Sequence, residues 1–209
     1  MKYQELKEQL KDFIVFSLND IRKIEPDFYR PRLNEWQAKR YIKKIRRGYY
    51  MFADLALNEE TLFLMANKLY VPSYVSFETA LSYYGLIPEG VYSITSVSTK
   101  KTARFKAPVA EFAYRKIKPS LFFGYKLEKQ KGQGYKIAQM EKALLDHLYF
   151  DPRIADEADF DEWRFNSEEF LARADMAKLH QYADAFKNKR LTARLKKILM
   201  FMRQADKQK

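Results

Sequence analysis

The densest group of chemically active side chains lies between residues 30 and 47, where eight lysines and arginines accompany one acidic residue, Glu35. Cations at this density repel one another unless an anion neutralises them. Lysine and arginine bind phosphate oxygens, whereas asparagine and glutamine pair well with an adenine edge. The stretch therefore predicts binding to double-stranded DNA. The residues expected to take part are Arg30, Arg32, Asn34, Gln37, Lys39, Lys43, Lys44, Arg46 and Arg47.

Two kinds of contact can be assigned within this DNA-binding set. The members between residues 30 and 37 suit base edges, with asparagine and glutamine reading adenine and arginine reading guanine. The cations from Lys43 to Arg47 suit phosphates, which position a protein on DNA without carrying sequence information. The alternative interpretation is a solvated basic helix beside a basic hairpin, with no ligand at all.

A second group of basic residues follows further along the chain, and its role stays open. These residues could touch nucleic acid. They could equally form a solvated strand edge, because charges at an edge discourage pairing between sheets of different molecules. The members of this second basic surface are Lys100, Lys101, Arg104, Lys116 and Lys118.

Residues able to perform catalysis or to bind a metal are sparse. The chain has no cysteine, and only His147 and His180 supply an imidazole. Glu141 and His147 are six residues apart and do not share one helix face, and Asp146 lacks a ligand partner at helical spacing. The sequence contains neither a recognisable Ser/His/Asp arrangement nor a phosphate-binding loop ending in Gly-Lys-Ser/Thr. We expect no metal site, no cofactor and no catalytic residue, and hence a protein that is not an enzyme.

The elements expected to position the DNA-binding set are three short helices and a hairpin. The helices are predicted over residues 3–12, over residues 18–24 and from Pro31 onward, by apolar spacing and by caps. Residues 41–52 place apolar positions around a basic turn at Gly48, which predicts a β-hairpin. This order is typical of a winged helix-turn-helix, in which the third helix enters the major groove and the hairpin follows the backbone. We assign it to residues 1–53.

Residues 54–209 predict a second domain of the α+β class. Ser76 is placed to cap a helix whose apolar face includes Phe77 and Tyr84, and Gly85 is placed to close it. The order of elements predicts a small, mainly antiparallel sheet with flanking helices. Strand candidates lie at 92–99, 102–105, 111–117 and 121–125, and helix candidates at 141–150, 168–187 and 190–204.

The composition of the chain indicates which kind of partner it binds and where in the cell we expect it. The net charge of +12 favours an anionic partner, and nucleic acid is the commonest one. The N-terminal segment is charged throughout, and no apolar run approaches the length that spans a membrane. We therefore expect a cytoplasmic protein that does not bind membranes.

Four segments are distinctive enough to compare with known families: ANKLYVPSYVSFETALSYYGLIPE, YSITSVSTKKTARF, FAYRKIKPSLFFGY and IAQMEKALLDHLYF. In this order they resemble the AbiEi-type antitoxins of type IV toxin–antitoxin systems, which are phage-defence modules. With the predicted helix-turn-helix, the resemblance covers nearly the whole chain. It implies an autorepressor that binds repeats in its own operon promoter. It also implies a C-terminal domain that counteracts a nucleotidyltransferase-like toxin without forming a stable complex with it.

Two other functions stay open on the sequence. One is a winged-helix transcriptional regulator with a ligand-sensing C-terminal domain, which an adjacent toxin gene would argue against. The other is a nucleic-acid-processing enzyme, whose metal-dependent turnover would depend on Glu141 or Asp146.

Overall fold

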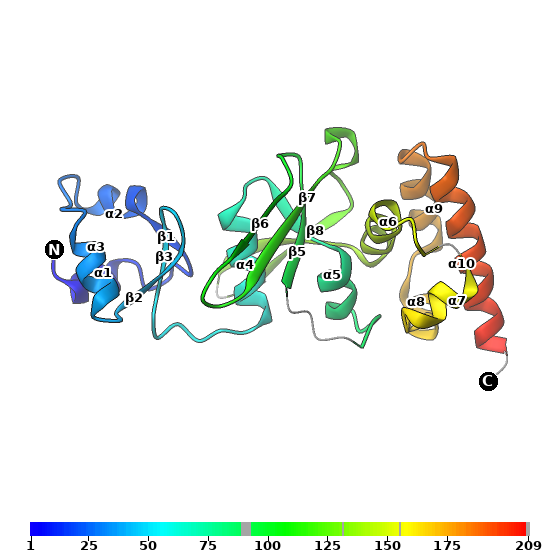
Figure 1. Cartoon of the computed structure of the whole chain (residues 1–209), viewed down its shortest axis with the longest axis horizontal. Helices are drawn as coiled ribbons and strands as arrows, with labels where there is room; N and C mark the ends of the chain where they lie inside the picture. The colour runs from blue at the N-terminus through cyan, green and yellow to red at the C-terminus, as the bar shows by residue number, and fades with distance from the viewer. Residues whose placement is uncertain (89–92, 131, 155, 208–209) are drawn as a thin grey trace.

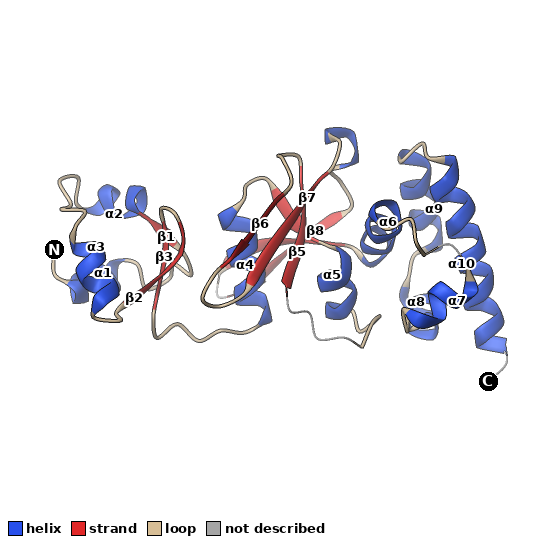
Figure 2. Ribbon diagram, viewed as in Figure 1, coloured by secondary structure: helices blue, strands red, loops and turns tan. Residues whose placement is uncertain are grey.

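The computed structural model describes residues 1–88, 93–130, 132–154 and 156–207. Figure 1 shows three regions in succession along the long axis: an N-terminal region, a central sheet with its helices, and a C-terminal group of helices. Helices and strands both contribute to the fold, so the predicted α+β class is confirmed (Figure 2).

The N-terminal region places short helices on a small antiparallel sheet with the strand order β1-β3-β2. Ser17 begins the second helix with a capping box: its Oγ accepts the N–H of Asp20 at 3.3 Å, and its own N–H donates to that carboxylate at 2.8 Å. The predicted three helices and hairpin are all present. The elements are α1 (Tyr3–Gln9), β1 (Phe16–Ser17), α2 (Leu18–Ile24), α3 (Arg32–Ala38), β2 (Ile42–Arg46) and β3 (Tyr49–Phe52).

The central sheet is larger than predicted, and it is mixed rather than mainly antiparallel. Its strand order is β6-β7-β5-β4-β9-β8, with β5 parallel to β7 and β4 parallel to β9. β7 inserts between β5 and β6, and β9 lies beside β4, so neighbours in sequence are not always neighbours in the sheet. The elements are α4 (Glu59–Leu69), β4 (Ser73–Val75), α5 (Phe77–Tyr83), β5 (Ser93–Ser98), β6 (Ala103–Lys106), β7 (Glu111–Lys116), β8 (Tyr125–Gln130) and β9 (Gln133–Ala138).

Two of the predicted elements differ from those observed. The prediction of a strand over 121–125 is wrong except at its last residue, because Leu121 ends a 3₁₀ turn, η1 (Pro119–Leu121), and β8 begins only at Tyr125. Pro119 suits the first position of that turn, where its missing N–H would have no partner. The prediction of one helix over 168–187 is also wrong, because this stretch forms two. Asp175 separates them because its side chain accepts the N–H of Lys178 at 2.9 Å and so starts a new helix.

The C-terminal helices cover the end of the central sheet region and form the right-hand part of Figure 1. The first of them packs against α5 on one side and against two of the later helices on the other. They are α6 (Met140–Phe150), α7 (Glu157–Glu162), α8 (Ser167–Arg173), α9 (Met176–Ala185) and α10 (Lys189–Lys207).

The buried apolar residues of the described chain form two hydrophobic clusters. One lies inside the N-terminal region, around Phe16 and Trp36. The other runs through the central and C-terminal regions and also includes four residues of the N-terminal region: Ile14, Val15, Ile45 and Met51. The N-terminal region is therefore docked on the central region by apolar packing, although the domain division predicted at residue 53 falls in the connection between β3 and α4.

Candidate nucleic-acid interface

The residues predicted to contact bases lie on and around α3. Leu33 and Trp36 lie on one side of this helix and pack into the N-terminal core. Asn34 lies on its exposed side, and Arg30 and Lys39, just before and after the helix, are also exposed. Within the residues that the structure describes, neither Arg30 nor Lys39 has an acidic partner. These side chains are therefore available to a ligand.

Two other members of the predicted set, Arg32 and Gln37, already have protein partners. Nη1 of Arg32 donates to the backbone oxygen of Met1 at 2.6 Å. The amide of Gln37 donates to the backbone oxygen of Leu33, one helical turn earlier, at 3.0 Å. Both side chains contribute to the N-terminal fold, and contact with a base would require them to exchange these bonds.

The hairpin presents Lys43, Lys44 and Arg47 to solvent. Across the described ranges of the chain, these three cations have no acidic partner. Gly48 closes the turn with a φ of +85°, a conformation that residues with a Cβ rarely adopt. The turn carries Arg47, and β2, which contacts α3, carries Lys43 and Lys44, so these cations suit phosphates beside that helix.

Arg46 differs from its neighbours because it lies at the junction with the central region. Its Nη1 donates to the backbone oxygen of Leu69 at 2.9 Å. Its guanidinium lies 4.8 Å from the ring centre of Phe105 and 5.6 Å from that of Tyr70. Cation–π contacts of this kind stabilise by about 0.5–2 kcal/mol each. Arg46 therefore holds the hairpin against the central region, a role that the sequence reasoning missed.

Part of the second basic surface reaches the same junction through Tyr70. The ammonium of Lys100 lies 5.6 Å from the centre of the Tyr70 ring. The Tyr70 hydroxyl donates to the backbone oxygen of Lys101 at 2.7 Å. Lys100 and Arg46 thus approach one aromatic side chain from different regions of the molecule.

The rest of the second basic surface is divided. Arg104, on the edge strand β6, is paired with Glu111. That pairing fits the interpretation of these residues as a solvated strand edge. Lys116, at the end of β7, and Lys118, just beyond it, are exposed. The structure therefore does not bring all five residues into one unneutralised patch.

A buried ion pair on α6 was missed at the sequence level. Lys142 and Asp146 lie one turn apart, and both side chains are 0% exposed. The Asp146 carboxylate also accepts the hydroxyls of Tyr74 at 2.9 Å and Ser76 at 2.8 Å. Burial raises the pKa of Asp146 and lowers the pKa of Lys142, while their mutual attraction opposes both shifts. The signal that could have revealed the pair is its i,i+4 spacing inside an otherwise apolar segment.

This network joins α6 to β4 and to the residue that follows the strand. Ser76 was expected to cap α5, but its side chain makes no capping bond and donates to Asp146 instead. Gly124 leaves room for the lysine, because a Cβ at that position would lie 2.9 Å from Cγ of Lys142. These are structural roles, since the pair is fully enclosed.

The three acidic and imidazole groups of α6 point to different partners. Oε1 of Glu141 accepts the backbone N–H of Asp175 at 2.8 Å. Asp146 belongs to the buried pair, and Nδ1 of His147 lies 3.4 Å from Oε1 of Glu78. Among the residues that the structure describes, no three His, Asp or Glu side chains are arranged to hold a metal ion.

Comparisons with known proteins provide no family assignment for this chain. No protein-family model matches the chain, and a search of curated proteins also found no match. None of the helices within the described ranges has the length and apolar character of a segment that crosses a bilayer. Function must therefore be inferred from the geometry of the molecule.

Proposed function

We propose that the N-terminal region binds double-stranded DNA as a winged helix-turn-helix. In that arrangement a helix enters the major groove and a neighbouring antiparallel hairpin follows the backbone. The helix α3 and the hairpin of β2 and β3 supply these two parts. The observation that carries the proposal is a set of exposed cations without acidic partners among the described residues: Arg30, Lys39, Lys43, Lys44 and Arg47.

The residues of this interface divide by task. Asn34 is exposed and suits an adenine edge, and Arg30 suits guanine. Lys43, Lys44 and Arg47 neutralise phosphates, and the counterions released in this way make binding weaker as salt rises. Arg46 takes no direct part, because its guanidinium is engaged at the junction.

The resemblance of the four segments to AbiEi-type antitoxins extends the proposal to a biological role. The protein would repress its own operon by binding promoter repeats, and it would counteract a nucleotidyltransferase-like toxin without a stable complex. This role needs no catalytic residue. It agrees with the structural partners of Glu141 and Asp146, the acids on which an enzyme would depend.

Fluorescence anisotropy tests the DNA-binding proposal directly. One probe is the duplex upstream of the gene, and the other is a scrambled duplex of equal length, both measured across a salt series. We expect tighter binding to the native duplex that persists at high salt, and Asn34→Ala should reduce this preference. Failure to bind either duplex would refute the proposal, and equal, salt-sensitive binding to both would refute its sequence-specific part.

A second candidate, a transcriptional regulator with a ligand-sensing C-terminal region, is favoured by one observation. A pocket of about 440 Å³ opens between α5, α6 and α7, a size within the range of small-molecule sites. The two candidates differ in their partner. Co-expression with any nucleotidyltransferase-like protein encoded beside the gene should relieve the toxicity of that protein only if the chain is an antitoxin. A small ligand should change operator affinity only if the chain is a ligand-sensing regulator.

A further inference from the structure

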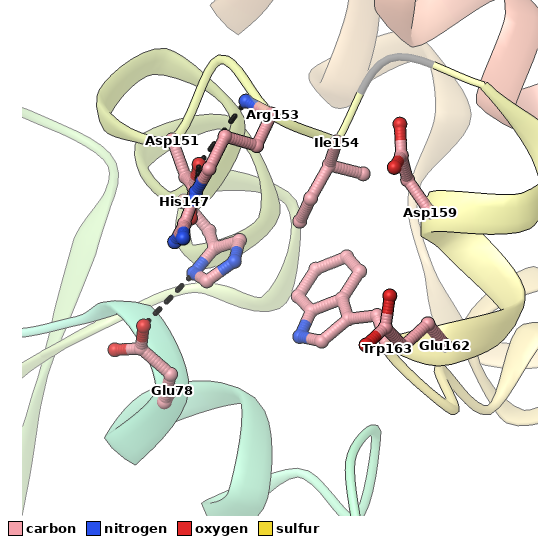
Figure 3. Close-up of a pocket in the computed structure, with 8 residues that line it drawn as sticks. All are labelled: Glu78, His147, Asp151, Arg153, Ile154, Asp159, Glu162 and Trp163. Carbon is pink, nitrogen blue, oxygen red and sulfur yellow. Dashed lines mark hydrogen bonds and ion pairs between the residues drawn. The ribbon is translucent and has the colours of Figure 1, made fainter.

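The pocket between α5, α6 and α7 gathers side chains from parts of the chain far apart in sequence (Figure 3). Glu78 comes from the first turn of α5, and His147 from the last turns of α6. Glu162 and Trp163 come from the end of α7. The lining as a whole combines four carboxylates with one histidine, one arginine, one tryptophan and one isoleucine.

His147 is the buried polar group of this pocket. Its side chain is only 7% exposed, and it stacks on Trp163 with ring centres 4.4 Å apart and planes at 9°. Nδ1 faces Glu78 at 3.4 Å, and Figure 3 shows the other ring nitrogen turned away from that carboxylate. Within the described part of the chain, this second nitrogen, Nε2, has no hydrogen-bond partner.

The protonation of His147 follows from its surroundings. Burial lowers its pKa, although Glu78 and Asp151 act in the opposite direction. The Glu78 carboxylate, 3.4 Å from Nδ1, favours the neutral form of the ring whose one proton is on Nδ1. Nε2 is then a hydrogen-bond acceptor within the pocket, so a matching ligand must donate an N–H or O–H there.

The rest of the lining also favours a donor. Arg153 is the cation of the lining, and Asp151 neutralises it: Nε and Nη2 donate to this carboxylate at 2.9 Å and 2.6 Å. These bonds lower the pKa of Asp151 to about 2. The carboxylates of Glu78, Asp159 and Glu162 add negative charge to the same pocket. Anions are therefore repelled, and a cation with several N–H groups is attracted.

We propose that this pocket binds a guanidinium group carried on an alkyl chain. A guanidinium is planar, has five N–H donors and no acceptor, and can donate to a carboxylate and to His147 Nε2 at once. Trp163 and Ile154 provide an apolar wall for the chain. An ammonium is a compact charge with three donors and matches acceptors spread over three elements less well. The proposal does not depend on DNA binding.

Isothermal titration of the full chain with three small probes tests the class of ligand. Butylguanidine carries the proposed group, butylurea is its neutral counterpart of similar shape, and pentylamine carries an ammonium. We expect butylguanidine to bind one per chain and about tenfold more tightly than either of the others. Equal binding of butylguanidine and pentylamine, or no binding of butylguanidine, would overturn the proposal.

Two measurements place the ligand in this pocket. Binding should change the tryptophan fluorescence of the wild-type protein, and the change should vanish in Trp163→Phe, because the other tryptophan, Trp36, lies in the N-terminal core. Glu162→Gln should weaken butylguanidine about tenfold. Asp161→Asn is the matched control, since it makes the same charge change at the preceding residue, which does not line the pocket. Equal reductions in Glu162→Gln and Asp161→Asn would show only diffuse attraction and overturn the proposal.

The source of the guanidinium is identified by two further probes. Agmatine represents a free metabolite, and acetyl-Gly-Arg-Gly-amide represents an arginine side chain of a partner protein. Tighter binding of agmatine supports a small-molecule ligand, and tighter binding of the peptide supports a protein partner. Both outcomes support the guanidinium class, whereas failure of both probes would overturn it.

Discussion

The hairpin of the N-terminal region and the helix α6 treat charge in opposite ways. On the hairpin, Lys43, Lys44 and Arg47 are exposed and have no acidic partner among the described residues. On α6, the side chains of Lys142 and Asp146 are 0% exposed and pair with each other. Leaving a cation unpaired in water costs little, but leaving a charge unpaired in the interior costs several kcal/mol. Under the proposal of DNA binding, the exposed cations of the hairpin serve a ligand, whereas the buried charges of α6 stabilise the fold.

The largest expected effect comes from breaking the buried pair. Asp146→Asn leaves the Lys142 ammonium without its counter-charge in the interior, so we expect the free energy of unfolding to fall by about 3–5 kcal/mol. Urea unfolding followed by circular dichroism measures this change. DNA binding by the fraction that stays folded should not change, because the central sheet separates α6 from the N-terminal region (Figure 1).

A double variant provides the control for that result. Lys142→Met combined with Asp146→Asn removes both charges, and it should recover much of the stability that the single variant lacks. A double variant that is less stable than Asp146→Asn would contradict the interpretation of these residues as a mutually dependent pair.

The hairpin cations should have the opposite phenotype: reduced DNA affinity with unchanged stability. The triple variant Lys43→Ala, Lys44→Ala, Arg47→Ala should bind any duplex about 100-fold more weakly at 0.1 M salt. The slope of log affinity against log salt should become shallower by about 0.9 for each phosphate that is no longer neutralised. Lys189→Ala, Arg190→Ala, Lys197→Ala removes the same charge from exposed positions on α10 and should bind as the wild type does.

Arg46 is intermediate between the exposed cations of the hairpin and the buried pair of α6, because it lies on the hairpin but has protein partners. Arg46→Ala should lower the free energy of unfolding by about 1–2 kcal/mol, because it removes the cation–π interactions and leaves the backbone oxygen of Leu69 unpaired. Arg47→Ala should leave stability unchanged and reduce the salt slope. Calorimetry on the two variants measures the change in stability, and fluorescence anisotropy measures the change in the salt slope of DNA binding. A reduced salt slope in Arg46→Ala would return this residue to the DNA-contacting set.

The smallest expected effect is the pH dependence contributed by His147. Burial holds its pKa below 6.5, so the unfolded chain takes up a proton at a higher pH than the folded protein does. The free energy of unfolding should therefore fall as pH drops below 6.5, by at most about 1.4 kcal/mol per pH unit for one group. Glu78, Asp151, Arg115 and Arg153 face the ring and modulate the effect.

Variants of the two histidines isolate this contribution to the pH dependence. Urea unfolding at several pH values should show a flatter dependence in His147→Gln than in the wild type. His180→Gln removes an exposed histidine and should retain the wild-type slope. Equal slopes in the wild type and in His147→Gln would assign the pH dependence to other groups.

The local elements of the N-terminal region could be predicted from the sequence, whereas the sheet order could not. Ser17, Gly48 and the apolar spacing of Leu33 and Trp36 act within a few residues of where they stand, and the predicted helices and hairpin are present. The parallel pairing of β5 with β7 and of β4 with β9 depends on contacts between distant segments. Periodicity within one strand carries no information on those neighbours.

The same distinction applies to the candidate sites. Charge density alone marked the exposed cations of the hairpin, because unpaired charge is visible in composition. The role of Arg46 was not predictable, since its partners Leu69 and Phe105 lie 23 and 59 residues later in the chain. The pocket around His147 was missed for the same reason, because its walls come from three separate elements. The ion pair on α6 could in principle have been predicted from the sequence, since Lys142 and Asp146 are only four residues apart.

The apolar seam formed by Ile14, Val15, Ile45 and Met51 limits how this protein can be rebuilt. A chain cut after residue 53 would leave these side chains facing water, so the isolated fragment would be prone to self-association. A gene fusion that moved residues 1–53 to another host would need a host surface shaped to cover them. The N-terminal region therefore depends on the surface of the central region that covers these four side chains.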